Sequence, residues 1–210
     1  MKKILIADDH TLLRTGIRFF IKSEYQTAQI DECHDGDGAW KNIQSTKYDL
    51  FIMDIHMPGT DSVSLLRNIF TIEPQLKVLI LTMSSEEIYA RKFLQLGVMG
   101  FINKGADAAE IRKAIASVLD SRIYLSPKLQ ESITYNAIKG VTKNSLFENL
   151  SVRELQVMTH LLEGKNISEI ADILCIHAST VSTHKTNILH KLKVSNVMEL
   201  SALVKRFNIA

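Results

Sequence analysis

The first half of the chain is organised around one stretch, Tyr48-Asp49-Leu50-Phe51-Ile52-Met53-Asp54-Ile55-His56-Met57-Pro58. The near-continuous apolar run from Leu50 to Met53 predicts a buried strand. The run ends at Asp54, and Pro58 soon afterwards lacks the N–H that further sheet pairing needs. Open α/β folds place their chemistry at the carboxyl ends of their parallel strands. The sequence therefore singles out the carboxylate of Asp54 as a candidate reactive group.

The composition is that of an ordinary globular protein. Of the 210 residues, 46% are hydrophobic and 23% are charged, which argues against long disordered segments. No apolar run reaches the roughly 18 residues of a membrane span, and Lys2-Lys3 leads into a short strand rather than into a signal peptide. Cys33 and Cys175 are far apart, and Cys175 is flanked by apolar residues, so we expect two reduced core thiols rather than a disulfide or a metal pair. These features predict a cytoplasmic protein without a membrane segment.

Short apolar segments alternate with amphipathic segments five times over residues 1–120. The predicted strands are Lys3–Ala7, Gln29–Cys33, Leu50–Asp54, Val78–Thr82 and Gly100–Asn103. The predicted helices are Thr11–Ser23, Gly38–Gln44, Ser62–Phe70, Glu86–Leu96 and Asp107–Leu119. This alternation predicts an α/β fold of the flavodoxin-like (βα)5 type, a doubly wound parallel sheet with helices on both faces.

Polar side chains stand at the ends of four of the predicted strands. Asp8 and Asp9 follow the first strand, Asp54 ends the third, Thr82 ends the fourth, and Lys104 follows the fifth. Because the carboxyl ends of the strands meet at one crevice, we expect these groups to lie together. Three carboxylates so close repel one another unless a hard cation joins them, and oxygen ligands suit Mg²⁺. An ionised carboxylate beside such a cation can attack phosphorus, while a hydroxyl and an ammonium group hold the remaining phosphoryl oxygens.

The alternation stops after residue 120. Ser126-Pro127 predicts a helix start with Pro at the first helical position. A weak apolar stripe follows at Leu129, Ile133 and Ile138, and residues 140–149 read as a loop. We therefore expect a linker with one helix over residues 121–147.

Only helical periods remain over residues 148–210, which predicts a separate all-α four-helix domain. Ser151 with Glu154, and Asn166 with Glu169, form two capping boxes that open the first two helices. Gly164 ends the first of them. The third helix is expected near Ser179–Lys193 and the fourth over Asn196–Phe207.

The second and third of these helices are joined by a tight turn, which favours a helix-turn-helix. Small hydroxyl side chains of the third helix lie away from or beside its apolar stripe, where they can enter a major groove. From residue 177 onward, five Lys and Arg residues stand against Glu199, a balance suited to phosphate contacts. Solvated lysines on an ordinary helical bundle would give the same charge.

Several motifs of the first half resemble the receiver domain of bacterial two-component response regulators, over residues 1 to about 120. They are Asp8-Asp9-His10, Asp54-Ile-His-Met-Pro58, Leu81-Thr82 and Gly100-Phe-Ile-Asn-Lys104. The resemblance implies that Asp54 is the phosphoacceptor, Thr82 the switch hydroxyl, Lys104 the phosphate partner and Phe101 the switch aromatic. It implies a Mg²⁺ site formed by Asp8, Asp9, Asp54 and the backbone carbonyl of His56. It also implies that His56 and Ser84 tune the lifetime of the acyl phosphate.

Motifs of the second half resemble the DNA-binding domain of the NarL/LuxR (FixJ) family over residues 148–210. They are Leu150-Ser-Val-Arg-Glu154, Gly164-Lys-Asn-Ile-Ser-Glu-Ile-Ala171, Thr180-Val-Ser-Thr-His184 and Ile188-Leu-His-Lys-Leu192. The implied DNA-binding residues are Lys165, Thr180, Ser182, Thr183, Lys185, Thr186 and Lys191. The implied dimerisation residues, on the last helix, are Val197, Leu200, Ser201 and Val204.

Together the two resemblances imply a two-component response regulator. A sensor histidine kinase would phosphorylate Asp54, and phosphorylation would control homodimerisation and sequence-specific binding to a double-stranded DNA operator, thereby regulating transcription. RNA polymerase is a further candidate partner. The protein would catalyse only its own phosphoryl transfer and dephosphorylation.

Two alternatives remain open from the sequence. A phosphohydrolase of the haloacid dehalogenase type also uses a strand-end Asp with Mg²⁺, but places a second Asp two positions on, where this chain has His56. A phosphorylated adaptor would bind protein partners only and leave no footprint on DNA.

Overall fold

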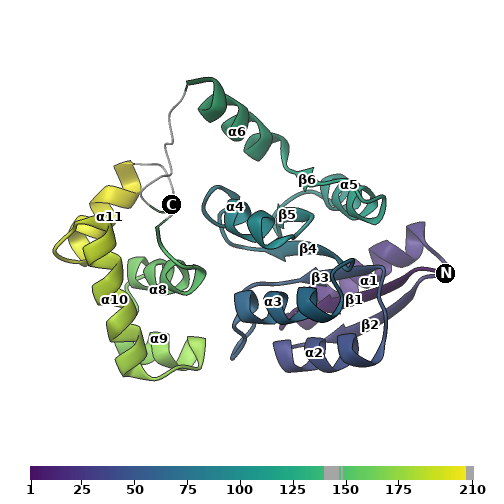
Figure 1. Cartoon of the computed structure of the whole chain (residues 1–210), viewed down its shortest axis with the longest axis horizontal. Helices are drawn as coiled ribbons and strands as arrows, with labels where there is room; N and C mark the ends of the chain where they lie inside the picture. Colours follow the sequence, from purple (N-terminus) through teal and green to yellow (C-terminus); the bar gives the residue numbers. More distant parts are fainter. Residues whose placement is uncertain (140–146, 148, 207–210) are drawn as a thin grey trace. The chain divides into compact units, whose positions relative to one another are not determined.

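A parallel sheet forms the first half of the protein in the computed structural model, which describes residues 1–139, 147 and 149–206 (Figure 1). Its strands are β1 Lys3–Ala7, β2 Gln29–Cys33, β3 Leu50–Met53, β4 Lys77–Thr82, β5 Gly100–Asn103 and β6 Tyr124–Leu125. They lie in the order β2-β1-β3-β4-β5-β6, and all neighbouring pairs are parallel. The first five strands have the order of a doubly wound flavodoxin-like sheet, which confirms the predicted fold class.

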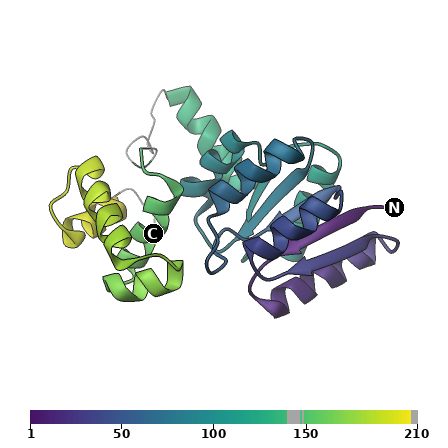
Figure 2. The same cartoon turned by 60° about the horizontal axis from the view of Figure 1, so that its bottom comes forward.

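Helices cover both faces of this sheet (Figure 2). They are α1 Thr11–Glu24, α2 Gly36–Ser45, α3 Ser62–Ile72, α4 Glu86–Leu96 and α5 Ala108–Leu119. Ile4 and Ile6 of β1 share one core cluster with Ile17 of α1 and Ile115 of α5. All four residues of β3 are buried, as expected for a strand whose two faces are both covered by helices.

Strand β6 was not predicted from the sequence. Its two residues pair with β5, with Tyr124 opposite Gly100 and Leu125 opposite Phe101. Two residues are too few to show a strand period. The sheet therefore extends into a segment that the sequence assigned to the linker. Helix α6 follows over Pro127–Lys139, beginning at the proline as predicted.

The chain divides into two compact units. The first contains Met1–Glu86 and Phe93–Pro127, and the second contains the described residues after Pro127 together with Glu87–Lys92. The second unit contains α8 Val152–Leu162, α9 Ile167–Leu174, α10 Ala178–Leu192 and α11 Val197–Arg206.

Both predicted capping boxes are present, at the starts of α8 and α9. The Ser151 hydroxyl accepts from the Glu154 N–H, while a Glu154 oxygen accepts from the Ser151 N–H. Asn166 and Glu169 make the same reciprocal pair. Gly164 follows α8 with φ +83°, a conformation that favours glycine.

Some predicted features lie outside the described residues, and one differs from the structure. The predicted loop over residues 140–149 lies outside the described residues except for 147 and 149, and so do Phe207 and the side chain of Ile138. Cys33 is buried as predicted, but Cys175 is exposed. Cys175 is the C-cap of α9 with φ 49°, so it follows the last helical core residue, Leu174, and is itself part of the turn. Among the described helices, none has the length and apolar character required to cross a bilayer.

Candidate functional site

A lysine bridges two carboxylates at the carboxyl edge of the sheet. The Lys104 Nζ lies 2.6 Å from Asp54 Oδ2 and 2.7 Å from Asp8 Oδ2. Asp8 follows β1, Asp54 follows β3 and Lys104 follows β5, so parallel pairing brings all three to one edge. Their side chains are between 3% and 6% exposed. The predicted convergence of these three groups is therefore present in the folded chain.

The protonation state of Lys104 follows from its surroundings. Burial alone would lower the pKa of its ammonium group. The hydrogen bonds and negative charges of Asp54 and Asp8 outweigh burial and raise the pKa above its ordinary value. Lys104 is thus a fixed cation at neutral pH.

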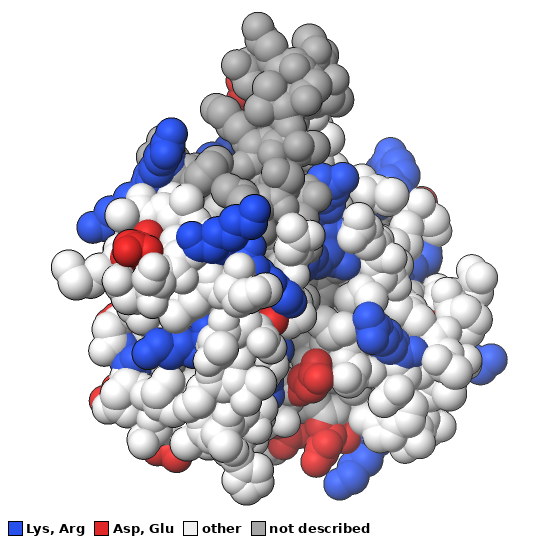
Figure 3. Space-filling view, turned by 60° about the vertical axis from the view of Figure 1, so that its left-hand side comes forward, with Lys and Arg blue, Asp and Glu red and all other residues white. Residues whose placement is uncertain are grey.

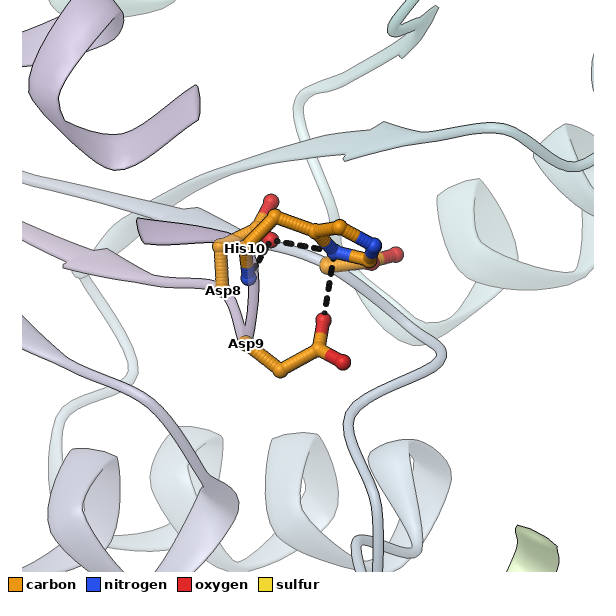
Figure 4. A group of neighbouring side chains, drawn as sticks. Asp8, Asp9 and His10 are labelled. Carbon is orange, nitrogen blue, oxygen red and sulfur yellow. Dashed lines mark hydrogen bonds and ion pairs between the residues drawn. The ribbon is translucent and has the colours of Figure 1, made fainter. Parts of the chain in front are cut away.

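Two further residues extend the acidic cluster outward. Figure 4 shows Asp8, Asp9 and His10 gathered at the end of β1. The His10 Nδ1 lies 3.2 Å from Asp8 Oδ1 and 2.8 Å from Asp9 Oδ1, and the His10 N–H donates to Asp8 Oδ1 over 2.9 Å. The His10 side chain is 68% exposed, so the cluster opens to solvent on this side. The sequence placed His10 in the motif but gave it no contact with the carboxylates.

The donor set fits a hard divalent cation. One potential ligand atom from each of Asp8, Asp9, His10 and Asp54 lies within 4.8 Å of the others. Asp9 Oδ1 is buried and accepts no hydrogen bond of normal geometry from the described residues. Mg²⁺ prefers oxygen ligands such as carboxylates. Here three carboxylates outnumber the ammonium group of Lys104. An acidic cluster of this kind is typical of Mg²⁺ binding in receiver domains.

The loops after β3 and β4 are joined beside this cluster. The His56 N–H donates to Asp54 Oδ1 over 3.2 Å, and the His56 ring is hydrogen-bonded through Nε2 to the Ser84 hydroxyl. Thr82 is fully buried, and its Oγ1 accepts from the Ser84 N–H over 3.3 Å. The Thr82 carbonyl accepts from the Lys104 N–H over 2.8 Å. The structure thus links Thr82 to the cluster through its backbone, while its hydroxyl is held by the next loop.

Phe101 lies in the centre of β5 and is fully buried. Its ring is 6.0 Å from that of Phe93, with an interplanar angle of 37°. In this structure the ring is part of the core of the first unit.

The exposed face of α10 carries the small polar side chains picked from the sequence. Thr180, Ser182, Thr183 and Thr186 are exposed, and Lys185 is half-buried. The hydroxyls of three of them donate to carbonyls one turn back, at distances of 3.0–3.1 Å. The opposite face is apolar and buried at Val181, Ile188 and Leu192.

The other two candidate phosphate ligands are already engaged within the unit. The Lys191 Nζ lies 2.7 and 2.9 Å from the two carboxylate oxygens of Glu154, whose side chain is 4% exposed. Burial alone would raise the pKa of Glu154, but Lys191 and Ser151 lower it below its ordinary value. The Lys165 Nζ lies 2.6 Å from Glu163 Oε2. Lys and Arg side chains are scattered over the face drawn in Figure 3, among uncharged groups and Asp and Glu side chains.

Two of the residues expected on a dimer surface are not at the surface. Leu200 is fully buried and Val204 is 2% exposed, because both hold α11 in the core of its own unit. Val197 and Ser201 are half-buried, and Met198 is 84% exposed. The assignment of Leu200 and Val204 is corrected accordingly: any dimer surface on α11 uses its other face.

A doubly wound sheet with an acidic cluster and a lysine at its carboxyl edge, joined to a helix-turn-helix unit, defines the class of two-domain response regulators. The chain belongs to this family: residues 4–116 match the response regulator receiver domain, and residues 148–204 match the luxR family of bacterial regulatory proteins.

Individual relatives agree with this assignment. The chain is 31% identical over 206 residues to the response regulator GacA of Pseudomonas syringae pv. syringae (strain B728a), covering 98% of this chain and 96% of GacA. It is 29% identical over 209 residues to the response regulator UvrY of Escherichia coli (strain K12), covering 100% and 96%.

Among solved structures, RcsB from Salmonella enterica serovar Typhimurium, bound to the promoter rprA in the presence of phosphomimetic BeF3-, gives a TM-score of 0.69 at 24% identity. The match covers 98% of this chain and 99% of RcsB. At this identity the likeness shows the fold alone. The protein is thus a two-component response regulator with a receiver domain and a LuxR-type DNA-binding domain, and its relatives are regulators rather than hydrolases.

Proposed function

We propose that this response regulator is phosphorylated on Asp54 by a phosphohistidine of a sensor histidine kinase. The observation that carries the proposal is the bridge that Lys104 makes between Asp54 and Asp8. A structural ion pair would need one carboxylate for one ammonium group. Here a second carboxylate shares that ammonium group, and Asp9 adds a third acidic group. Such an excess of buried negative charge is costly without a ligand of positive charge.

The chain's own groups supply most of the machinery for phosphoryl transfer. An Asp54 oxygen attacks phosphorus, the P–N bond of the phosphohistidine breaks, and the imidazole leaves with that electron pair and takes up a proton. The His56 N–H and the Lys104 ammonium, which hold the two Asp54 oxygens, become donors to the phosphoryl oxygens. Mg²⁺ held by Asp8, Asp9, Asp54 and the His56 carbonyl would neutralise the developing negative charge.

Phosphorylation then biases a switch. The phosphoryl group adds about 1.5 to 2 negative charges and strong acceptor oxygens. In our proposal the Thr82 hydroxyl leaves the Ser84 N–H to donate to this group, and Phe101 turns as that loop moves. The two arrangements exist before phosphorylation, and the modification shifts their populations. The chain acts as an enzyme only on itself, in taking up and losing the phosphoryl group.

The output of the switch is control of transcription in the cytoplasm. The exposed Thr180, Ser182, Thr183 and Thr186 of α10 face bases in the major groove. Lys165, Lys185 and Lys191 serve the phosphates, the first and last while also paired with acidic residues. Related RcsB has been solved on a promoter with a phosphomimetic, which supports a DNA-bound active form.

Phosphorylation promotes a two-fold dimer that reads half-sites about one helical turn apart. Of the expected dimerisation residues, Val197 and Ser201 remain available for that dimer, and the exposed Met198 lies beside Val197 on α11. RNA polymerase is a further partner of the DNA-bound form. We assign residues 1–120 together with strand β6 to the phosphoacceptor domain, the segment from Ser126 to residue 147 to the linker, and residues 148–210 to the DNA-binding domain.

The test compares Asp54→Asn with Asp37→Asn, an exposed acidic position on α2. Each variant is incubated with Mg²⁺ and acetyl phosphate, and phosphate incorporation is followed by intact mass. We expect one phosphate per wild-type and Asp37→Asn chain and none on Asp54→Asn. Undiminished incorporation into Asp54→Asn would remove the basis of the proposal. A wild-type affinity for DNA that does not change with beryllofluoride would remove the regulatory part.

A further inference from the structure

A single carboxylate touches both the active-site edge of the sheet and the start of the linker helix. Glu86 is the first residue of α4. Its Oε1 accepts from the Asn103 N–H over 2.9 Å, and its Oε2 accepts from the Ser126 hydroxyl. Asn103 directly precedes Lys104, and Ser126 directly precedes helix α6. The two oxygens of Glu86 therefore hold two segments that are more than twenty residues apart in sequence.

Asn103 ties the same point to the loop that carries Thr82. Its side-chain amide donates to the carbonyls of Met83 and Ser84, over 3.2 and 3.4 Å. Its Oδ1 accepts from the Gly105 N–H over 2.8 Å. The loop after β4 and the turn after β5 are thus cross-linked around Asn103, with Glu86 bonded to its backbone.

The linker side of this contact is equally constrained. Ser126 is 6% exposed and follows β6 directly, and β6 pairs with β5 at Leu125 opposite Phe101. Glu86 is half-buried, and a hydroxyl that donates to a partly buried carboxylate makes one of the stronger hydrogen bonds in proteins. The neighbouring Glu87–Lys128 pair is 3.3 Å long, but its Lys128 side chain is 84% exposed, so water and salt screen it. Glu86 is therefore the residue suited to carry a signal.

We propose that Glu86 is a positioning residue that couples the phosphoacceptor site to the linker through Ser126. This inference rests on the proposed phosphorylation of Asp54. When the Thr82 hydroxyl moves toward the phosphoryl group, the loop from Thr82 to Glu86 moves with it. Glu86 cannot keep ideal geometry to both Asn103 and Ser126 during that motion, because its two oxygens are rigidly joined. Ser126, which directly precedes α6, is thereby held differently in the unphosphorylated and phosphorylated states. Helix α6 leads along the chain to the DNA-binding domain.

Coupling of this kind is a ratio of affinities. The relevant quantity is the DNA dissociation constant of the free protein divided by that of the beryllofluoride-bound protein. A substitution on the coupling path changes this ratio of DNA dissociation constants without changing how the receiver itself takes up phosphate. By linkage, the same variant also changes how strongly DNA favours beryllofluoride binding.

The experiment uses the full chain with Ser126→Ala, which removes the linker contact and leaves the Asn103 contact of Glu86 in place. Ser126→Thr retains a hydroxyl and serves as the rescue variant. Ser64→Ala is the matched control, because the Ser64 hydroxyl also donates to a carboxylate, that of Asp61, on an exposed turn of α3. For each variant we measure the rate of phosphate incorporation from acetyl phosphate and the DNA affinity with and without beryllofluoride and Mg²⁺.

We expect Ser126→Ala to reduce the ratio of DNA affinities by about threefold or more, within the usual range of coupling energies. The phosphorylation rate stays within about twofold of wild type, and Ser126→Thr and Ser64→Ala keep the wild-type ratio. Glu86→Gln, which weakens the same acceptor, is expected to have little additional effect in the Ser126→Ala background.

Two results would overturn the inference while leaving the proposed function intact. One is a wild-type ratio in Ser126→Ala. The other is a loss of ratio that merely follows an equal loss of phosphorylation, since Ser126 would then act on the receiver site alone. A wild-type protein whose DNA affinity ignores beryllofluoride would instead refute the proposed function, and the coupling with it.

Discussion

Replacement of Lys104 by Met is the sharpest test of the buried cluster. The variant keeps most of the apolar stem and removes the charge that two carboxylates share. At an effective dielectric constant near 20, each contact of 2.6–2.7 Å is worth about 6 kcal/mol before desolvation is counted. Breaking a buried pair by removing one partner costs about 3–5 kcal/mol in net stability. Because both Asp8 and Asp54 lose their partner, we expect a loss near this range in the absence of divalent cations.

Mg²⁺ should then offset part of that loss. In the wild-type protein the cation shares the carboxylates with Lys104, whereas in Lys104→Met it meets them without a competing ammonium group. A ligand at 100 times its dissociation constant stabilises the folded state by about 2.7 kcal/mol. The difference in unfolding free energy between the two proteins is therefore expected to narrow by about 1–2 kcal/mol when EDTA is replaced by saturating Mg²⁺.

The chain has a single tryptophan, Trp40 on α2, so its fluorescence in urea reports the unfolding of the first unit. The matched control is Lys22→Met, since Lys22 Nζ donates to the Ala28 carbonyl over 2.6 Å and touches no carboxylate of the cluster. Relative to wild type, Lys22→Met should lose the same amount of unfolding free energy in EDTA as in Mg²⁺. If the gap between wild type and Lys104→Met stays constant or widens with Mg²⁺, the carboxylates do not form the cation site and the reasoning fails.

Three other outcomes are expected. His56→Ala should change the lifetime of phosphorylated Asp54 by about threefold or more, because a hydrogen bond such as His56–Ser84 is worth about 0.5–1.5 kcal/mol. The decay rate is measured as the loss of phosphate in mass spectra, and an unchanged rate would discard this role. Lys185→Ala should reduce the salt slope of DNA binding by about one, as a full phosphate contact does. Lys191→Ala should reduce the slope by less, because Glu154 shares the charge of its ammonium group. Equal slope changes in the two variants would contradict the distinction. The folded pKa of Glu154 lies below its ordinary value of 4.5, so its stabilising effect is complete above pH 4.5 and is lost as the pH falls through the lower folded value. Glu154→Gln should therefore make the stability of the helical unit, followed by circular dichroism, less dependent on pH in acid. An acid dependence as steep as in wild type would contradict this role.

Features set by local sequence were predicted well. The capping boxes at Ser151 and Asn166 are reciprocal bonds within four residues, so their sequence pattern contains the whole interaction. The strand β3 was predicted within one residue, because a short continuous apolar run is typical of a parallel strand that is buried on both faces. The convergence of Asp8, Asp54 and Lys104 followed from topology, since the carboxyl ends of parallel strands lie at one edge.

Features that depend on which surfaces meet were not predicted. The apolar face of α11 is visible in the sequence, but an apolar stripe does not tell a dimer surface from the unit's own core, and Leu200 and Val204 belong to the core. Lys191 looks like a DNA ligand from charge alone, while its pairing with Glu154 requires the packing of α10 against α8. The side chain of Cys175 is exposed because the left-handed cap of α9 turns it outward.

Consecutive residues at the end of β5 serve different parts of the molecule. Side chains of neighbouring residues in an extended chain point to opposite sides. Lys104 reaches Asp54 and Asp8, whereas Asn103 reaches the loop after β4 and offers its N–H to Glu86. The Lys104 N–H also bonds the Thr82 carbonyl, so the ladder between β4 and β5 continues past the last strand residue. Asn103 and Lys104 thus place the phosphoacceptor site, the loop after β4 and, through Glu86, the residue that precedes α6 in one connected set of contacts.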